Sequence, residues 1–194
     1  LAYATERIIE LSLIAGVALL LAVVMSAPFI IEVLAGPTGK PAVAVLQIQG
    51  LALVATFLSM ATGFVLLSTR HHGALLIANG AALVANITLT LTLVPVWQAR
   101  GAAVAAVIAE SCLALGQLIL VARHGSGRVN VAALPAIAVA GLVGASPLLI
   151  DGLHPILRTV LGVGLYTVVL AVLGRFPPEV SHALDRRRHR ETVR

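Results

Sequence analysis

Long apolar segments, separated by short polar breaks, constrain this chain more than any other feature of its sequence. A helix needs about 20 mainly apolar residues to cross the hydrocarbon core of a bilayer. The runs are continuous and lack the period-two alternation of membrane strands, so they predict helices. Six segments approach or exceed the required length: residues 11–34, 43–68, 74–94, 101–122, 131–150 and 157–173.

The low charge content points to lipid as the solvent. Of the 194 residues, 59% are hydrophobic and only 11% are charged, whereas soluble domains have about 25% charged residues. There is too little polar surface to cover a water-soluble fold of this size. We therefore predict an all-α, multi-pass bundle of about six helices in the cell (cytoplasmic) membrane, formed by residues 1–175 and followed by a basic cytoplasmic tail, 176–194.

Short breaks and the distribution of basic residues predict the topology. Each break is only a few residues long, so sequential helices should be antiparallel. With the N-terminus inside, only Lys40, Arg100 and Arg158 of the thirteen Lys and Arg residues fall outside. Because basic residues favour the cytoplasmic side, both ends of the chain are predicted to be cytoplasmic.

The formal charge of +5 does not indicate a nucleic-acid partner. Most of the excess lies in loops and in the tail, and no soluble basic module with aromatic side chains is present. The tail contains the run Arg186-Arg187-Arg188. Each basic residue near an anionic surface contributes about 1 kcal/mol, so we expect the tail to bind anionic membrane lipids.

The sequence between residues 94 and 101 predicts a tight turn between two membrane helices. Pro95 cannot donate a backbone hydrogen bond, Trp97 suits a membrane–water boundary, and Arg100 will not enter hydrocarbon unaided. Gly101 then opens a run of small residues, which allows another helix to approach closely.

Polar residues at helical spacing inside the apolar segments are the candidate functional groups. Polar side chains in lipid are costly unless they face protein or water, so they mark substrate or ion pathways. Glu110 lies roughly 13 Å from Gly101 along its helix. The competing interpretation is simple interhelical hydrogen bonding, about 0.6 kcal/mol per contact. The candidates for cavity, substrate or coupling roles are Gln49, Thr56, Asn79, Asn86, Thr90, Glu110 and Gln117.

The residue patterns of catalysis are absent from the sequence. All six histidines fall in loops or in the tail, and no His or Cys pair has zinc-ligand spacing. There is no glycine-rich phosphate loop, and the single Cys112 cannot form an intrachain disulfide. We predict no enzyme activity, no metal and no cofactor, although a membrane-embedded enzyme of envelope lipid synthesis and a non-catalytic scaffold remain as alternatives.

Four groups of short stretches in the apolar segments form a pattern that can be compared with known membrane proteins. They are Ala27-Pro28-Phe29-Ile30 with Leu34-Ala35-Gly36, Leu46-Gln47-Ile48, Ala85-Asn86-Ile87 with Leu93-Val94-Pro95, and Gly101-Ala102-Ala103-Val104-Ala105. This pattern resembles the polysaccharide flippases of the multidrug, oligosaccharidyl-lipid and polysaccharide exporter superfamily, over about residues 11–122. One departure is that Trp97-Gln98-Ala99-Arg100 replaces the usual brief aromatic-Gly turn.

The resemblance implies a role as part of a larger transporter. Members have twelve to fourteen helices in two bundles, and this chain, which starts with Leu1 rather than Met, would match the ninth to fourteenth. The whole protein would move a polyprenyl-pyrophosphate-linked oligosaccharide across the membrane by alternating access, together with a missing N-terminal bundle. A half bundle alone would be inactive. The alternative within the superfamily is a drug or toxin exporter coupled to Na⁺ or H⁺.

Overall fold

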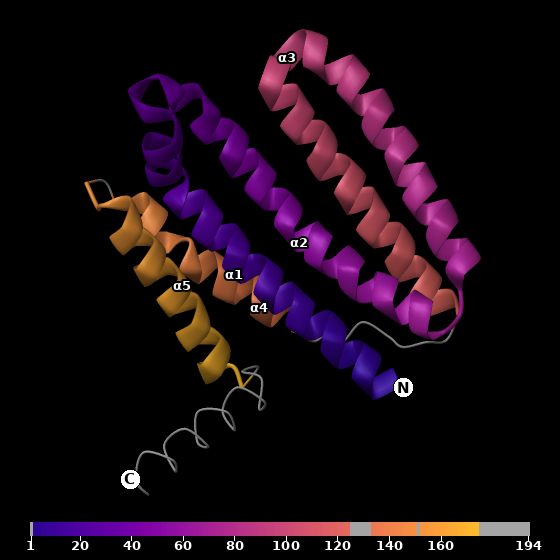
Figure 1. The fold of residues 1–194 in the computed structure, drawn as a ribbon. Helices are drawn as coiled ribbons and strands as arrows, with labels where there is room; N and C mark the ends of the chain where they lie inside the picture. Colours follow the sequence, from indigo (N-terminus) through magenta and orange to yellow (C-terminus); the bar gives the residue numbers. More distant parts are fainter. Residues whose placement is uncertain (1, 125–132, 151, 175–194) are drawn as a thin grey trace, which may run out of the picture.

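Every regular element of the described chain is helical. The computed structural model describes residues 2–124, 133–150 and 152–174, and within these ranges no strand is present (Figure 1). This confirms the predicted all-α class. The tail, 176–194, lies outside the described residues, so its role stays a prediction. The elements are α1 (Ala2–Ala35), η1 (Gly36–Gly39), α2 (Lys40–Ser68), α3 (His72–Arg123), α4 (Ala133–Gly144), η2 (Ser146–Leu149) and α5 (Pro155–Val172).

Three helical stretches are long and apolar enough to cross a membrane: Tyr3–Ser68, His72–Arg123 and Pro155–Val172. The first stretch contains α1 and α2, joined by η1. The predicted span 131–150 is different, because α4 has only 12 residues before Ser146-Pro147 begins the 3₁₀ turn η2. Proline cannot continue a helix without losing a backbone hydrogen bond. The count of six crossings therefore stays a prediction.

Helix α1 begins well before the apolar segment that predicted it. Its first turns include Arg7 and Glu10, whose side chains form an ion pair at 3.1 Å between the Arg7 guanidinium and a Glu10 carboxylate oxygen. These residues are three apart, the spacing at which side chains on one helix face meet. Hydropathy detects only apolar sequence, and for this reason it placed the start of the helix at residue 11.

Helix α3 is a hairpin of two arms. Gln98 interrupts it with φ 51° and ψ −130°, and Figure 1 shows the chain reversing there. We call residues 72–97 the first arm and residues 99–123 the second arm. Gly101 lies against the Leu93 backbone, so that a Cβ atom at this position would be 2.6 Å from the Leu93 carbonyl carbon. The predicted turn between residues 94 and 101 is confirmed, and Gly101 provides the close approach.

Helix α2 packs between α1 and α3, and α4 and α5 pack against the other side of α1. Their core lies in two places. One cluster joins α1, α4 and α5 around Met25, Ile137 and Tyr166, whose hydroxyl donates to the Ile14 carbonyl at 3.0 Å. The other joins α2 to the second arm through Val65, Leu66 and Val121.

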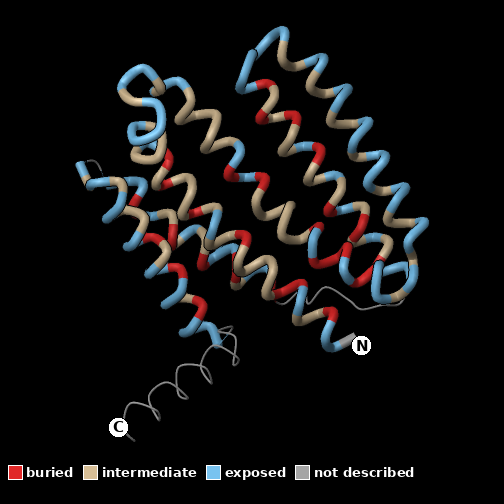
Figure 2. Tube along the Cα trace, viewed as in Figure 1, coloured by how far each residue is buried: buried red, intermediate tan, exposed pale blue. Residues whose placement is uncertain are grey.

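The first arm of α3 is the outermost helix of this arrangement. None of its described residues is buried, whereas the second arm buries seven, among them Gly101, Gln117 and Val121 (Figure 2). The start of α1, the α2–α3 junction and the end of α3 gather at one end of the molecule, with η1 and the Gln98 bend at the other (Figure 1). The predicted cytoplasmic loops thus share one end, and the orientation itself stays a prediction.

Candidate functional site

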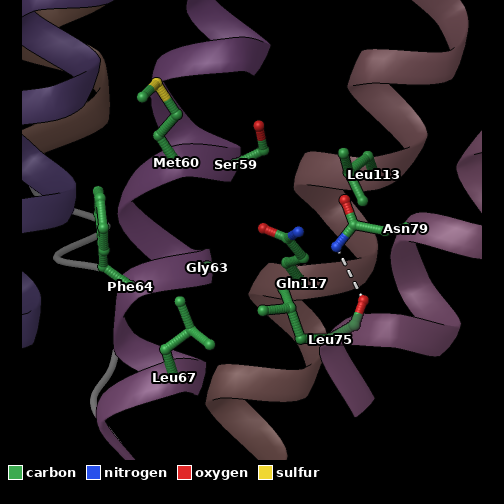
Figure 3. A pocket seen from close by; sticks show the side chains of 9 residues that line it. All are labelled: Ser59, Met60, Gly63, Phe64, Leu67, Leu75, Asn79, Leu113 and Gln117. Atoms are coloured by element: carbon green, nitrogen blue, oxygen red, sulfur yellow. Dashed lines mark hydrogen bonds between the residues drawn. The ribbon is translucent and has the colours of Figure 1, made fainter. Parts of the chain in front are cut away.

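A pocket of about 260 Å³ lies where α2 meets both arms of α3 (Figure 3). Apolar side chains form most of its wall, and three polar side chains, Ser59, Asn79 and Gln117, face it from three different helical segments. Met60, Phe64 and Asn79 are exposed, so the pocket is open on one side. The full lining is Ser59, Met60, Gly63, Phe64, Leu67, Leu75, Asn79, Leu113 and Gln117.

Gln117 is held at the base of the pocket by a hydrogen bond to α2. The Thr62 hydroxyl donates to Oε1 of Gln117 at 2.8 Å, and both side chains are buried, with exposed fractions of 0% and 2%. The Leu58 carbonyl also lies 2.8 Å from this hydroxyl. The Ser59 carbonyl is a third acceptor, at 3.2 Å. Because the hydroxyl has one proton, Gln117 shares it with the Leu58 and Ser59 carbonyls. Figure 3 shows the Gln117 amide nitrogen on the side turned toward Asn79.

The other two polar residues of the pocket form hydrogen bonds within their own helices. Asn79 donates from Nδ2 to the Leu75 carbonyl at 2.8 Å (Figure 3), and the Ser59 hydroxyl donates to the Thr56 carbonyl at 2.9 Å. The Asn79 side-chain oxygen and the Gln117 amide nitrogen retain their own hydrogen-bonding capacity. A ligand in the pocket can therefore meet both an acceptor and a donor.

Of the seven candidates predicted from the sequence, the structure brings two to the pocket, Asn79 and Gln117. Gln49 is exposed on α2, and the half-buried Thr56 donates its hydroxyl to the Ala52 carbonyl at 3.0 Å. Thr90 donates to Asn86 Oδ1 at 3.3 Å within the first arm. Neither Asn86 nor Thr90 lines the pocket. Asn79, Asn86 and Thr90 are spaced by seven and four residues and so share one helix face, but that face does not form one continuous wall of the pocket.

Glu110 lies on the second arm, two turns before Gln117 and on the same helix face. It is half-buried and is not part of the pocket lining. A carboxyl at this depth of an apolar helix suits a proton or cation site better than a contact with a neutral ligand. Glu110 lies about 10 Å from Gln117 along the helix axis and about 5 Å from Leu113, the lining residue nearest to it on the second arm.

Sequence reasoning missed Thr62 and Ser59. The spacing of seven residues that relates Gln49, Thr56 and Gly63 on one face of α2 includes neither of them. A signal was nevertheless present, because Ser59 and Thr62 are three apart, and such a pair presents hydroxyls on one helix face. In a membrane helix, small polar residues of this kind are typical of helix–helix contact surfaces.

The chemistry of this pocket is that of uncharged hydrogen bonding. Among the residues that the structure describes, the nine that line it include no charged side chain, and no group of three or more His, Cys, Asp or Glu is placed to hold a metal ion. Carboxamides and a hydroxyl beside Phe64 suit a ligand that has both hydroxyl groups and apolar faces.

A second hollow, of about 610 Å³, lies at the η1 end of the molecule. Glu32 and Lys40 both line it, and both are exposed. It contains none of the predicted candidates, and its residues come from the region where α1 passes through η1 into α2. We therefore place the candidate site at the pocket beside Gln117.

No protein-family model, curated protein or solved structure matches this chain.

Proposed function

We propose that this chain is part of a membrane transporter that moves a polyprenyl-pyrophosphate-linked oligosaccharide across the cytoplasmic membrane by alternating access. The observation that carries the proposal is the uncharged polar pocket between α2 and the two arms of α3, with Gln117 fixed by Thr62 at 2.8 Å. A carrier needs such a polar site within otherwise apolar helices, since the site must receive a polar headgroup away from bulk water.

The lining of the pocket favours a sugar as the polar part of the ligand. Sugar hydroxyls both donate and accept hydrogen bonds, as the carboxamides of Asn79 and Gln117 do. Phe64 offers an apolar surface to the C–H face of a sugar ring. The absence of a carboxylate from this lining is unfavourable for a cationic drug, because a buried cation needs a charged partner.

The pyrophosphate would stay near the basic end of the helices. Arg70 follows the pocket residue Leu67 by one turn, and Arg123 lies about 9 Å beyond Gln117 along the second arm. Arginine is the side chain best suited to phosphate oxygens. The missing N-terminal bundle is the partner that we propose for the open side of the pocket, at Met60, Phe64 and Asn79.

The test is transbilayer movement of a lipid-linked oligosaccharide in proteoliposomes that contain the protein expressed from its own gene. A lectin or glycosidase added outside reports the sugar that has crossed. Asn79→Ala removes a side chain that bonds to the Leu75 carbonyl of its own helix. The helix should therefore persist while the initial rate falls about tenfold, as expected for the loss of one or two ligand hydrogen bonds. Thr88→Val is the matched control, because Thr88 is exposed and donates to the Val84 carbonyl one turn earlier.

Equal rates in the Asn79→Ala and wild-type proteins, with the control also unchanged, would contradict the assignment of the pocket. Chemical alteration of the lipid during the assay would instead favour a membrane enzyme. Residues 1–194 alone should not support movement, since the pocket lacks a cover on one side; full activity from this segment alone would contradict the proposed need for a second bundle.

A second candidate function, a cation-coupled exporter, is supported by Glu110. Its carboxyl is half-buried and lies midway along the second arm, where an ionisable group is a functional candidate by default. Glu110→Gln preserves the shape of the side chain and removes its charge. If export of a cationic dye depends on a proton or Na⁺ gradient and this substitution abolishes that dependence, the exporter replaces the flippase as the better assignment.

A further inference from the structure

The two ends of the α3 hairpin meet through a pair of histidines. His71 is the N-cap residue of α3 and His124 is its C-cap residue. Their imidazole rings are in contact, with centroids 3.9 Å apart and planes inclined at 51°. The two residues are far apart in sequence, and only the reversal of α3 at Gln98 brings them together.

The α2–α3 junction holds His71 firmly in this position. Arg70 adopts a left-handed conformation with φ 62°, and two turn bonds run from the Arg70 N–H to the Leu67 carbonyl at 3.1 Å and from the His71 N–H to the Leu66 carbonyl at 2.9 Å. This pair of bonds is the Schellman motif that ends many helices. The backbone of His71 is therefore part of a defined helix cap.

Hydrogen bonding fixes the tautomer of His124 and favours the same tautomer of His71. His124 Nδ1 lies 2.7 Å from the Leu120 carbonyl, which can only accept, so Nδ1 is the protonated nitrogen. His71 Nδ1 lies 3.0 Å from the Thr69 hydroxyl oxygen, and that hydroxyl donates its own proton to the Val65 carbonyl at 2.9 Å. The Leu66 carbonyl is a second acceptor for the same hydroxyl, at 3.2 Å. With the hydroxyl proton on either carbonyl, His71 Nδ1 is the donor to the Thr69 oxygen. In the neutral rings, both Nε2 atoms then have free lone pairs.

We propose that His71 and His124 form a binding site for a divalent transition-metal ion, with Nε2 of each ring as a ligand and water in the remaining positions. A metal-ligating histidine generally donates its other ring N–H to a carbonyl or similar acceptor, and both rings have this arrangement here. Imidazole nitrogens suit Zn²⁺, Cu²⁺ and Ni²⁺ rather than Mg²⁺ or Ca²⁺. The site does not depend on the proposed transport function.

The surroundings set what the site can do. Among the described residues no third His, Cys, Asp or Glu joins the pair, so the ion would keep open coordination positions. Arg70 and Arg123 are exposed neighbours along the chain, and their positive charge reduces affinity for a cation at low ionic strength. Binding would tie the start of the first arm to the end of the second and so close the open end of the hairpin.

The experiment uses the detergent-purified chain without a polyhistidine tag, titrated with Zn²⁺ by calorimetry and with Cu²⁺ by electron paramagnetic resonance. We expect one site per chain with nitrogen hyperfine coupling from two imidazoles. His71→Ala and His124→Ala should each weaken Zn²⁺ binding at least tenfold, and the double variant should be no weaker than either single one. Thr69→Val, which removes the acceptor of the His71 Nδ1–H, should weaken binding about tenfold although both ligands remain.

His72→Ala is the matched control, since His72 is adjacent in sequence and lies outside the ring pair; His154→Ala is a second. Unchanged affinity in either ligand variant, or an equal loss in His72→Ala, would overturn the proposal. Chemical modification of the unsubstituted protein tests the proposal even if a variant misfolds. Zn²⁺ should protect His71 and His124, and not His72, from carbethoxylation by diethyl pyrocarbonate, and equal modification of all three would also overturn it.

Discussion

The Thr62 hydroxyl and Oε1 of Gln117 lie 2.8 Å apart, with both side chains almost wholly closed off from solvent. This bond is a direct polar link between α2 and the second arm of α3, and it holds Gln117, one of the residues that line the pocket. It also explains how a carboxamide can lie within apolar helices, because a polar group in lipid must find a partner inside the protein.

We expect Thr62→Val to destabilise the helix pair by about 0.6 kcal/mol, and by no more than about 1.7 kcal/mol, the range measured for hydrogen bonds between membrane helices. Valine has nearly the shape of threonine, so the loss reports mainly the bond. Unfolding in mixed micelles measures it. A double-mutant cycle with Gln117→Leu should give a coupling energy of the same size, and additive single effects would show that the two groups do not interact.

Gly101→Val should open the α3 hairpin. Its Cβ would meet the Leu93 carbonyl group and lie 3.0 Å from the Val94 backbone nitrogen, so backbone rather than flexible side chain has to move. Overpacking of this kind costs about 1–3 kcal/mol. Gly116 lies on the same arm, and a Cβ atom added there would have no neighbour within 4 Å, so Gly116→Ala should be neutral or slightly stabilising. Thermal unfolding followed by circular dichroism distinguishes the two variants.

Gly162→Ala should loosen the packing of α5 on α1 and α4. An added methyl group would meet Met25 and lie 2.8 Å from the Gly144 carbonyl oxygen, so the helices must separate. Gly164 lies two residues further along α5 and has open space around it, which makes Gly164→Ala the matched control. We expect a loss of about 1–3 kcal/mol for the first variant alone. Faster amide hydrogen exchange in α5 would show the loosening, and equal exchange in both variants would refute the contact.

Arg70→Gly should stabilise the protein by about 1 kcal/mol. Arg70 is held at φ 62°, a left-handed conformation that costs residues with a Cβ atom roughly 1–2 kcal/mol and glycine almost nothing. Arg70→Ala removes the same charge but keeps the Cβ, so it should show no gain. The midpoint of thermal unfolding measures both variants; an equal rise in the two would assign the effect to charge rather than to backbone conformation.

The predicted orientation can be tested with cysteines introduced in a Cys112→Ser background. Lys40 lies at the η1 end of α2 and Arg70 at its opposite end, and both are exposed. In intact cells an impermeant maleimide should label Lys40→Cys, whereas Arg70→Cys should react only after the membrane is permeabilised. The reverse pattern would invert the topology, and labelling of both from outside would exclude a crossing by α2.

The sequence by itself determined that the chain is helical and that its helices suit a membrane. A sufficiently long apolar run favours a membrane helix whatever its neighbours in the fold are. The existence of α1, α2, the two arms of α3 and α5 could therefore be predicted from the hydropathy along the chain. The tight turn before Gly101 was equally local, since proline, tryptophan and arginine act there through their own chemistry. The seven-residue spacing of Glu110 and Gln117 also placed both on one helix face.

Only the tertiary structure decided which polar groups meet. Gln117 pairs with Thr62, and Asn79 shares its pocket, while Asn86, Thr90 and Gln49 lie elsewhere. These outcomes depend on the rotation and register of α2 against α3. The spacing of residues within one helix does not determine how that helix is rotated against its neighbour. The same holds for His71 and His124, which are brought into contact because one unusual backbone conformation at Gln98 folds a 52-residue helix back on itself.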